Sequence, residues 1–316
     1  MNVLVTGGAG FIGSNLVRSL VAAGERVRVL DNLSTGSERN LARTNGSVEL
    51  RIGDVRDPDA VRDAVAGIDV VHHLAALPTV ARSVADPIAT NDVNVNGTLN
   101  MLVAARDAGV RRLIYASSSS VYGDTPSLPK HEEMAVVPQS PYAASKLAGE
   151  VYCRGFTRVY GLETVSLRFF NVFGPRQDPM SEYSAVIPLF ARGMLHGRPP
   201  RILGDGLQSR DFTYVANAVQ ACVLAAEAGS PAEGESMNIG CGERITLLDL
   251  VEELNDLLGT DHEPAFGPGR VGDVRHSLAS IDKAERLIGY RPLVRLREGL
   301  GQTIAWLESH EREPAS

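Results

Sequence analysis

The sequence predicts an α/β fold in which a doubly wound parallel sheet is joined to a smaller mixed lobe. Three observations support this fold class. In the first half of the chain, short β-branched runs alternate with amphipathic helical stretches, as βαβ units require. A glycine-rich stretch, residues 7–13, separates the first run from the first helical stretch. After residue 170 a segment rich in proline and glycine interrupts the alternation, and mainly helical patterns follow.

The expected elements follow from the spacing of apolar residues in each stretch. Strands are expected at residues 2–6, 26–30, 48–52, 70–73, 113–117 and 164–169. Helices are expected at residues 11–23, 89–108, 142–159, 186–195, 215–228, 246–258, 281–288 and 297–308. We therefore place one domain at residues 1–170 and a smaller lobe at residues 171–316, with some segments of the second half returning to the first domain.

Composition narrows the range of partners. The chain has 316 residues, 44% of them hydrophobic and 22% charged, which is typical of a globular protein. A net charge of −7 argues against binding of nucleic acid or of an anionic membrane, and no apolar run is long enough to span a membrane. Three widely spaced cysteines predict a reducing compartment and no zinc site. A strand-like run directly after Met1 argues against a secretory signal, so we expect a cytoplasmic protein with a small ligand and no metal.

The glycine-rich stretch predicts a dinucleotide site. Gly7, Gly10 and Gly13 are three residues apart, which allows a sharp turn, close approach of a pyrophosphate and packing of the following helix. The alternative is an ordinary tight turn between strand and helix. Asp31 ends the second strand, where a carboxylate can bind ribose hydroxyls and repel a 2′-phosphate, so NAD is favoured over NADP. Asp54 could bind the adenine amino group or cap a helix.

A second set of residues predicts acid–base chemistry. Tyr142 and Lys146 are four residues apart at the start of an expected helix, so their side chains share one face. An ammonium group and an oxidised nicotinamide would both lower the pKa of the tyrosine, which could then accept a proton from an alcohol. The alternative is a surface tyrosine stacked on a lysine. Residues 117–120 are four serines at the carboxyl end of the fifth strand, where a hydroxyl could bridge substrate and tyrosine, or form a plain polar loop.

Taken together, these features resemble the extended short-chain dehydrogenase/reductase superfamily and, within it, the nucleotide-sugar 4-epimerases. The resemblance spans nearly the whole chain and implies a Rossmann-like NAD-binding domain followed by a mixed α/β lobe that binds a UDP-sugar. It is based on the motifs GGAGFIGS (7–14), DNLSTG (31–36), HHLAA (72–76), SSSSVYGD (117–124), SPYAASK (140–146), RFFNVFGPRQ (168–177), GDGLQSRDFTYV (204–215) and RVGDVRHS (270–277).

The resemblance also implies individual roles. Tyr142 would be the catalytic base, Lys146 its pKa modulator and a ligand of the nicotinamide ribose, and Ser118 the hydroxyl on the substrate oxygen, with Ser120 as an accessory contact. The NAD site would comprise Gly7, Gly10, Phe11, Ile12, Gly13, Asp31, Asn32, Asp54, Val55, Leu74, Ala75, Ala76, Tyr142 and Lys146. The nucleotide diphosphate would be held by Asn171, Arg210, Arg270 and Asp273. One departure is Pro78, where galactose-type epimerases carry a lysine near the cofactor phosphates.

The residues beside the catalytic hydroxyl bear on the reaction. Sugar 4,6-dehydratases resembling this chain carry an Asp-Glu pair where it has Ser119 and Ser120, and UDP-glucuronate decarboxylases carry a glutamate at the second position. The remaining expectation is oxidation at C4, rotation of the 4-keto intermediate and return of the hydride to its other face. A dehydratase or decarboxylase of the same superfamily, and a non-catalytic NAD-binding regulator, remain as alternatives.

The hexose and the oligomeric state are open at this point. Ser277 lies at a position where the resemblance places a gatekeeper, and a small residue there would admit an N-acetyl group. Arg192 could pair with the carboxylate of UDP-glucuronate or be a solvated helix charge. UDP-glucose, UDP-glucuronate and UDP-N-acetylglucosamine are all retained, with glucuronate favoured if Arg192 faces the site. The helices expected at 89–108 and 142–159 match those that pair in family homodimers, unless their apolar faces are used entirely against the sheet.

Overall fold

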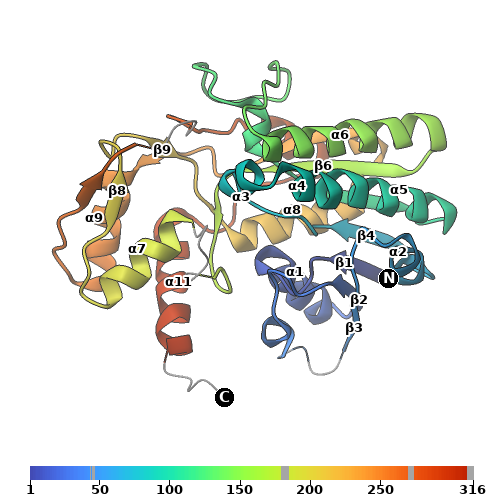
Figure 1. Cartoon of the computed structure of the whole chain (residues 1–316), viewed down its shortest axis with the longest axis horizontal. Coiled ribbons are helices and arrows are strands. Elements are labelled where there is room, and N and C mark those ends of the chain that lie inside the picture. Colours follow the sequence, from blue (N-terminus) through green and yellow to red (C-terminus); the bar gives the residue numbers. More distant parts are fainter. Residues whose placement is uncertain (43, 45–46, 179–184, 270–273, 312–316) are drawn as a thin grey trace.

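The computed structural model describes residues 1–42, 44, 47–178, 185–269 and 274–311. A seven-stranded parallel sheet, in the order β11-β6-β5-β4-β1-β2-β3, forms its centre and confirms the predicted α/β class (Figure 1). Its strands are β1 (Asn2–Thr6), β2 (Arg26–Asp31), β3 (Val48–Ile52), β4 (Val70–His73), β5 (Arg112–Ser118), β6 (Glu163–Phe169) and β11 (Glu235–Ile239).

Helices cover both faces of this sheet. The side chains of β1 alternate, so that Val3 and Val5 join one hydrophobic core with α1 and α8, whereas Leu4 joins another with α2 and α5. The helices in chain order are α1 (Phe11–Ala22), α2 (Pro58–Val65), α3 (Val80–Ala85), α4 (Pro87–Asn91), α5 (Gly97–Asp107), α6 (Pro141–Tyr160), α7 (Val186–Leu195), α8 (Val215–Glu227), α9 (Leu247–Leu258), α10 (Asp282–Ile288) and α11 (Leu296–Glu311). In the described ranges no helix is long and apolar enough to cross a membrane.

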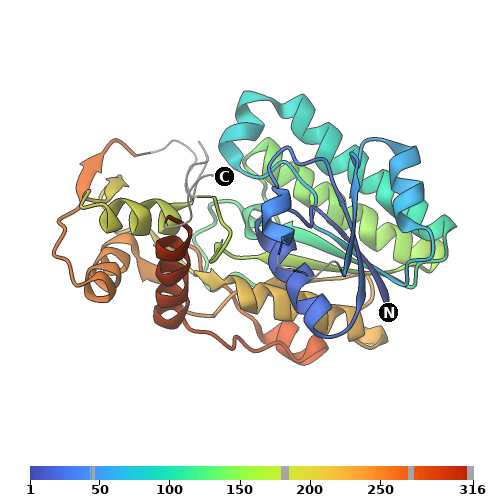
Figure 2. The same cartoon turned by 90° about the horizontal axis from the view of Figure 1, so that it is seen from below.

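The smaller lobe is built from short strand pairs and three helices. Strands β8 (Arg201–Leu203) and β13 (Ala265–Gly267) pair in parallel, and β9 (Ser209–Arg210) pairs antiparallel with β12 (Ile245–Thr246). A third pair, β7 (Val172–Phe173) and β10 (Thr213–Tyr214), lies at the start of the lobe. Helices α7, α9 and α11 pack against one another, and Figure 2 shows the lobe beside the sheet.

Several short elements were not predicted from the sequence, among them α2, α3 and the strand pairs of the lobe, and two larger differences concern the sheet and the helices beside the site. The single helix expected at 89–108 is divided into α4, a π-helical turn at Asp92–Asn96 and α5. The turn directs Asn94 towards Leu77, whose backbone N–H it accepts at 2.8 Å, and towards Ser145 at 3.0 Å. Strand β11 was not predicted because its sequence lacks a β-branched run, yet it pairs with β6 over five positions.

Candidate active site

One large cavity, of about 1680 Å³, lies between the sheet and the lobe. Its walls include residues that follow the carboxyl ends of β1, β2, β4, β5 and β6, which is where doubly wound sheets bind their ligands. The lobe contributes Arg210, His276 and Ser277, and α11 contributes Trp306. The lining residues thus extend from the glycine-rich turn to the lobe.

The glycine-rich turn forms one end of the cavity. Gly7 has φ +69°, and a Cβ atom there would lie 2.8 Å from the backbone nitrogen of Ala75. A Cβ atom on Gly13 would lie 2.1 Å from the carbonyl oxygen of Gly7. Helix α1 begins after Gly10 without a side-chain cap, so its first N–H groups remain available to a ligand. This arrangement fits the pyrophosphate of a dinucleotide.

Asp31 and Asp54 occupy different environments. The Asp31 carboxylate, 8% exposed, lines the cavity and accepts the backbone N–H of Ala9 at 2.9 Å and of Leu33 at 2.8 Å. These bonds hold it where ribose hydroxyls would bind. Asp54 instead bonds to the Arg56 guanidinium, which lowers its pKa to about 2, and it is not among the lining residues, although its neighbours on both sides are. Nor does it cap a helix, because the N-cap of α2 is Asp57.

The structure brings Ser118, Tyr142 and Lys146 together at the centre of the cavity. Tyr142 lies in the first turn of α6, which Ser140 caps by accepting the N–H of Ala143 at 3.1 Å. Lys146 is one turn further, with its Nζ 5.9 Å from the centroid of the Tyr142 ring. The Oγ of Ser118, at the end of β5, accepts bonds from the N–H and Oγ of Ser120 at 3.2 and 2.9 Å.

Burial shifts the pKa values of Lys146 and Tyr142 in opposite directions. It lowers the pKa of Lys146 to about 8, because an ammonium is costly to desolvate. Burial raises the pKa of Tyr142, and a hydrogen bond with Ser118 lowers it in part. The lowered tyrosine pKa expected from the sequence is thus not produced by these protein groups alone.

The other predicted substrate-binding residues fall into three groups. Asn171, Arg210 and Ser277 line the cavity at its lobe end. Arg192 lies in the last turn of α7 and is not among the described lining residues, so the structure does not bring it to the site. Arg270 and Asp273 lie outside the described residues.

Sequence reasoning missed several lining residues. Arg82 on α3 and Arg176 after β7 place guanidinium groups at the cavity, and burial lowers the pKa of Arg176 to about 10. Arg176 donates a hydrogen bond to Asn15 of α1, a contact between residues 161 positions apart. No local pattern marks such residues, since only the fold brings their segments together.

The fold and site together define a dinucleotide-binding α/β protein with a Ser-Tyr-Lys group in its cavity, and comparisons with known proteins identify the family. The sequence profile of the "NAD dependent epimerase/dehydratase family" matches residues 3–240, and the chain belongs to this family. A UDP-glucose 4-epimerase of Mycolicibacterium smegmatis is 41% identical over 315 residues, which cover 98% of this chain and 99% of that protein.

Solved structures agree with this assignment. A UDP-N-acetylglucosamine 4-epimerase from Methanobrevibacter ruminantium, in complex with UDP-N-acetylmuramic acid, is similar with a TM-score of 0.93 and 40% identity, covering 98% of each chain. A UDP-glucose 4-epimerase from Thermotoga maritima with UDP-glucose gives a TM-score of 0.94 at 38% identity, covering 99% of this chain and 100% of that one. The cofactor of the family is NAD, and the glycine turn and Asp31 fit it.

Proposed function

We propose that this protein is an NAD-dependent 4-epimerase of a UDP-hexose. The observation that carries the proposal is the juxtaposition of Ser118, Tyr142 and Lys146 in a cavity that continues from the glycine turn to Arg210. Such a cavity can hold a dinucleotide at one end and a sugar nucleotide at the other, with the hexose between them.

Each of the three residues has a distinct part in the proposed reaction. A bound NAD⁺ would supply the hydride acceptor for C4, and its reduced form would be the hydride donor for the opposite face of the same carbon. Tyr142 accepts the proton of the C4 hydroxyl and gives it back after the sugar has turned. Ser118 bonds to the C4 oxygen and orients it towards Tyr142. Lys146, held at Ala116, contributes positive charge beside the phenolate.

Rotation of the sugar requires that its diphosphate stay bound. Arg210 lines the lobe end of the cavity, and a guanidinium group suits the paired oxygens of a diphosphate. We propose that Arg210 and Arg270 hold the diphosphate while the 4-keto sugar rotates.

The choice of epimerisation over elimination depends on the carboxyl groups of the cavity. Among its described lining residues only Asp31 and Asp178 carry a carboxyl group, and neither occupies one of the two positions directly after Ser118. Elimination across C5 and C6 would need an acid and a base beside the hexose. Ser119 and Ser120 hold those positions and supply only hydroxyl groups.

We propose a neutral UDP-hexose, UDP-glucose or UDP-N-acetylglucosamine, as substrate. The argument for glucuronate depended on Arg192 facing the hexose, and Arg192 is not a lining residue. Ser277 does line the cavity, and its small side chain matches what the resemblance implies for a site that admits a larger substituent at C2. The two similar proteins of known structure are a UDP-N-acetylglucosamine 4-epimerase and a UDP-glucose 4-epimerase, which supports the same choice here.

The test is incubation of the purified protein with each UDP-sugar without added NAD, followed by NMR of the products. The 4-epimer of UDP-glucose or UDP-N-acetylglucosamine is expected. A 4-keto-6-deoxy sugar would show that the protein is a dehydratase, and release of carbon dioxide from UDP-glucuronate would show a decarboxylase. Bound NAD without any sugar chemistry would favour a regulator.

A further inference from the structure

A buried carboxylate lies two helical turns beyond the proposed catalytic base. Tyr142, Lys146 and Glu150 are spaced four residues apart on α6, so they share one face of that helix. Glu150 is 5% exposed. Its partner is Arg168 of β6, 4% exposed, whose Nε and Nη2 donate to the two carboxylate oxygens at 2.9 and 2.7 Å.

The same carboxylate bonds to two further strands. The Oγ of Ser117 on β5 donates to Oε1, and the Oγ of Ser236 on β11 donates to Oε2 at 3.1 Å. Ser117 and Arg168 are direct partners in the β5–β6 register, so they lie side by side beneath α6. Glu150 therefore joins α6 to three adjacent strands of the sheet.

The strands that it joins carry the proposed site. Ser118 immediately follows Ser117, and Asn171 follows Arg168 by three residues at the lobe end of the cavity. The base is on α6, whereas the hydroxyl that orients the substrate is on β5. Any slip of α6 along the sheet would change the distance between Ser118 and Tyr142.

We propose that Glu150 and Arg168 are positioning residues for epimerisation, which set the register of α6 against β5 and so hold Ser118 beside Tyr142. The inference rests on the proposed function. Neither residue lines the cavity, so neither contacts the substrate or the cofactor. A buried ion pair contributes little net stability compared with apolar residues of similar size, which leaves geometry as the reason for its presence.

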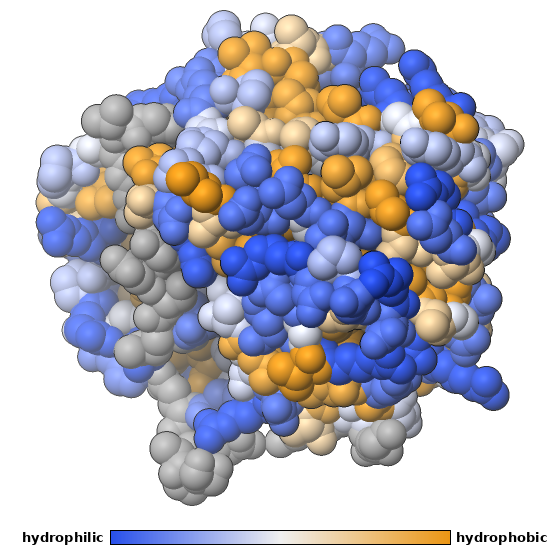
Figure 3. All heavy atoms as spheres, turned by 45° about the vertical axis from the view of Figure 1, so that its right-hand side comes forward, coloured by the Kyte–Doolittle hydropathy of each residue, from blue (hydrophilic) through white to orange (hydrophobic). Residues whose placement is uncertain are grey.

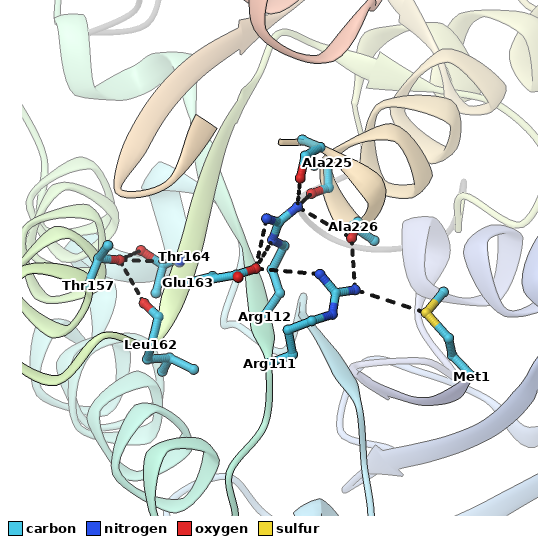
Figure 4. Close-up of polar contacts among 10 residues, drawn as sticks. Met1, Arg111, Arg112, Thr157, Leu162, Glu163, Thr164, Ala225 and Ala226 are labelled. Carbon is cyan, nitrogen blue, oxygen red and sulfur yellow. Dashed lines mark hydrogen bonds and ion pairs between the residues drawn. The ribbon is translucent and has the colours of Figure 1, made fainter. Parts of the chain in front are cut away.

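The chain contains a matched control at the other end of the same two strands. Arg112, the first residue of β5, donates to Glu163, the first residue of β6, at 2.8 Å, and also bonds to the carbonyl oxygen of Ala225 at 3.1 Å (Figure 4). Arg112 is 2% exposed and Glu163 is its direct register partner. This pair stabilises the same sheet but lies far along the strands from the cavity.

The experiment compares Glu150→Gln, Ser117→Ala and the control Glu163→Gln. The amide in Glu150→Gln keeps the size of the side chain but cannot accept both guanidinium bonds, and Ser117→Ala removes one hydroxyl only. We expect both to lower kcat about 10- to 100-fold, as a misplacement of about 1 Å can do, with KM and NAD content unchanged. Glu163→Gln should lower Tm without changing kcat.

Two results would overturn the inference: wild-type kcat in Ser117→Ala, or an equal loss of kcat in Glu163→Gln. If Glu150→Gln does not fold, Ser117→Ala decides alone. The rate of cofactor reduction after mixing with UDP-sugar, read from its near-ultraviolet absorbance, separates this inference from the proposed function. If the cofactor is reduced but no 4-epimer forms, epimerisation is refuted, and the rate of reduction still reports the effect of each variant. If the wild-type protein shows neither cofactor reduction nor a 4-epimer, the proposed function and this inference are both refuted.

Discussion

The Nζ of Lys146 donates a hydrogen bond to the carbonyl oxygen of Ala116 at 2.8 Å and lies 5.2 Å from the centroid of the Tyr115 ring. Lys146 is 5% exposed, and no ion pair of this ammonium is found in the described part of the chain. Burial of this ammonium therefore lowers the stability of the folded state. The position of Lys146 is explained by the positive charge that it is proposed to place beside Tyr142.

Replacing Lys146 should increase stability while it removes activity. Because burial lowers the Lys146 pKa to about 8, the unfolded chain binds more protons than the folded one between pH 8 and 10.5, and the free energy of unfolding rises with pH there. In NAD-free protein, Lys146→Met should raise the free energy of unfolding at pH 7 by up to roughly 3 kcal/mol. This gain should disappear by pH 10.5. Urea unfolding across this range measures it, and Lys283→Met, at a less buried lysine paired with Glu235, should show no such gain.

Tyr142→Phe should preserve binding and lose turnover. The phenyl ring keeps the packing of α6, but no group can then accept the C4 hydroxyl proton, so kcat should fall roughly 10²- to 10⁴-fold. Steady-state kinetics with the NAD content of each preparation provide the measurement. Tyr152→Phe, at an exposed tyrosine of the same helix, is the control and should retain full activity. Near-normal turnover by Tyr142→Phe would remove this residue from its role.

The sequence predicted the residues that line the site better than the residues that support them. Tyr142 and Lys146 could be found because their spacing is local to one helix. Glu150 has the same spacing from Lys146, but a glutamate on a helix is usually a solvated charge, and only folding brings Arg168 of β6 against it. Asn94 was missed for a related reason, since the π-helical turn that directs it interrupts the regular period on which the prediction relied.

The NAD site should be sensitive to a single methyl group. Wild-type protein should retain NAD through purification, because epimerisation regenerates the cofactor in each cycle. Gly13→Ala should lose it, because the added Cβ would lie 2.1 Å from the Gly7 carbonyl oxygen and force the turn open. Gly301→Ala, in helix α11 with no atom within 4 Å of the new Cβ, should retain NAD and keep or slightly improve stability. Release of nucleotide on denaturation, measured by chromatography, distinguishes the two variants.

We predict a homodimer through α5 and α6, because the side of the molecule formed by α6 and the adjacent α4 exposes apolar side chains. Val151 and Val159 on α6 are 65% and 72% exposed, and Ile88 on α4, which packs against α6, is 74% exposed. Figure 3 shows apolar patches interrupting the polar surface on the side that includes the right of Figure 1. Light scattering should give about twice the chain mass of 33.8 kDa. Val151→Asp should yield a monomer, and Leu293→Asp, at an equally exposed leucine outside these helices, should not. A monomeric wild-type protein would contradict the prediction.

Ser277→Tyr should discriminate between the two proposed sugars. Ser277 lines the cavity and is held at its backbone, where its N–H donates to the carbonyl oxygen of Ser209 at 3.0 Å. Since Ser277 is 8% exposed and lines the cavity, we expect a phenol ring at this position to extend into the space proposed for the C2 substituent. The variant should lose about 100-fold in kcat/KM with UDP-N-acetylglucosamine and much less with UDP-glucose, whose C2 hydroxyl is smaller. Ser277→Ala keeps a small residue and should leave the ratio of the two kcat/KM values unchanged. Equal losses on both sugars in Ser277→Tyr would mean that position 277 holds the nucleotide or the fold, and would leave the choice of hexose to other residues of the cavity.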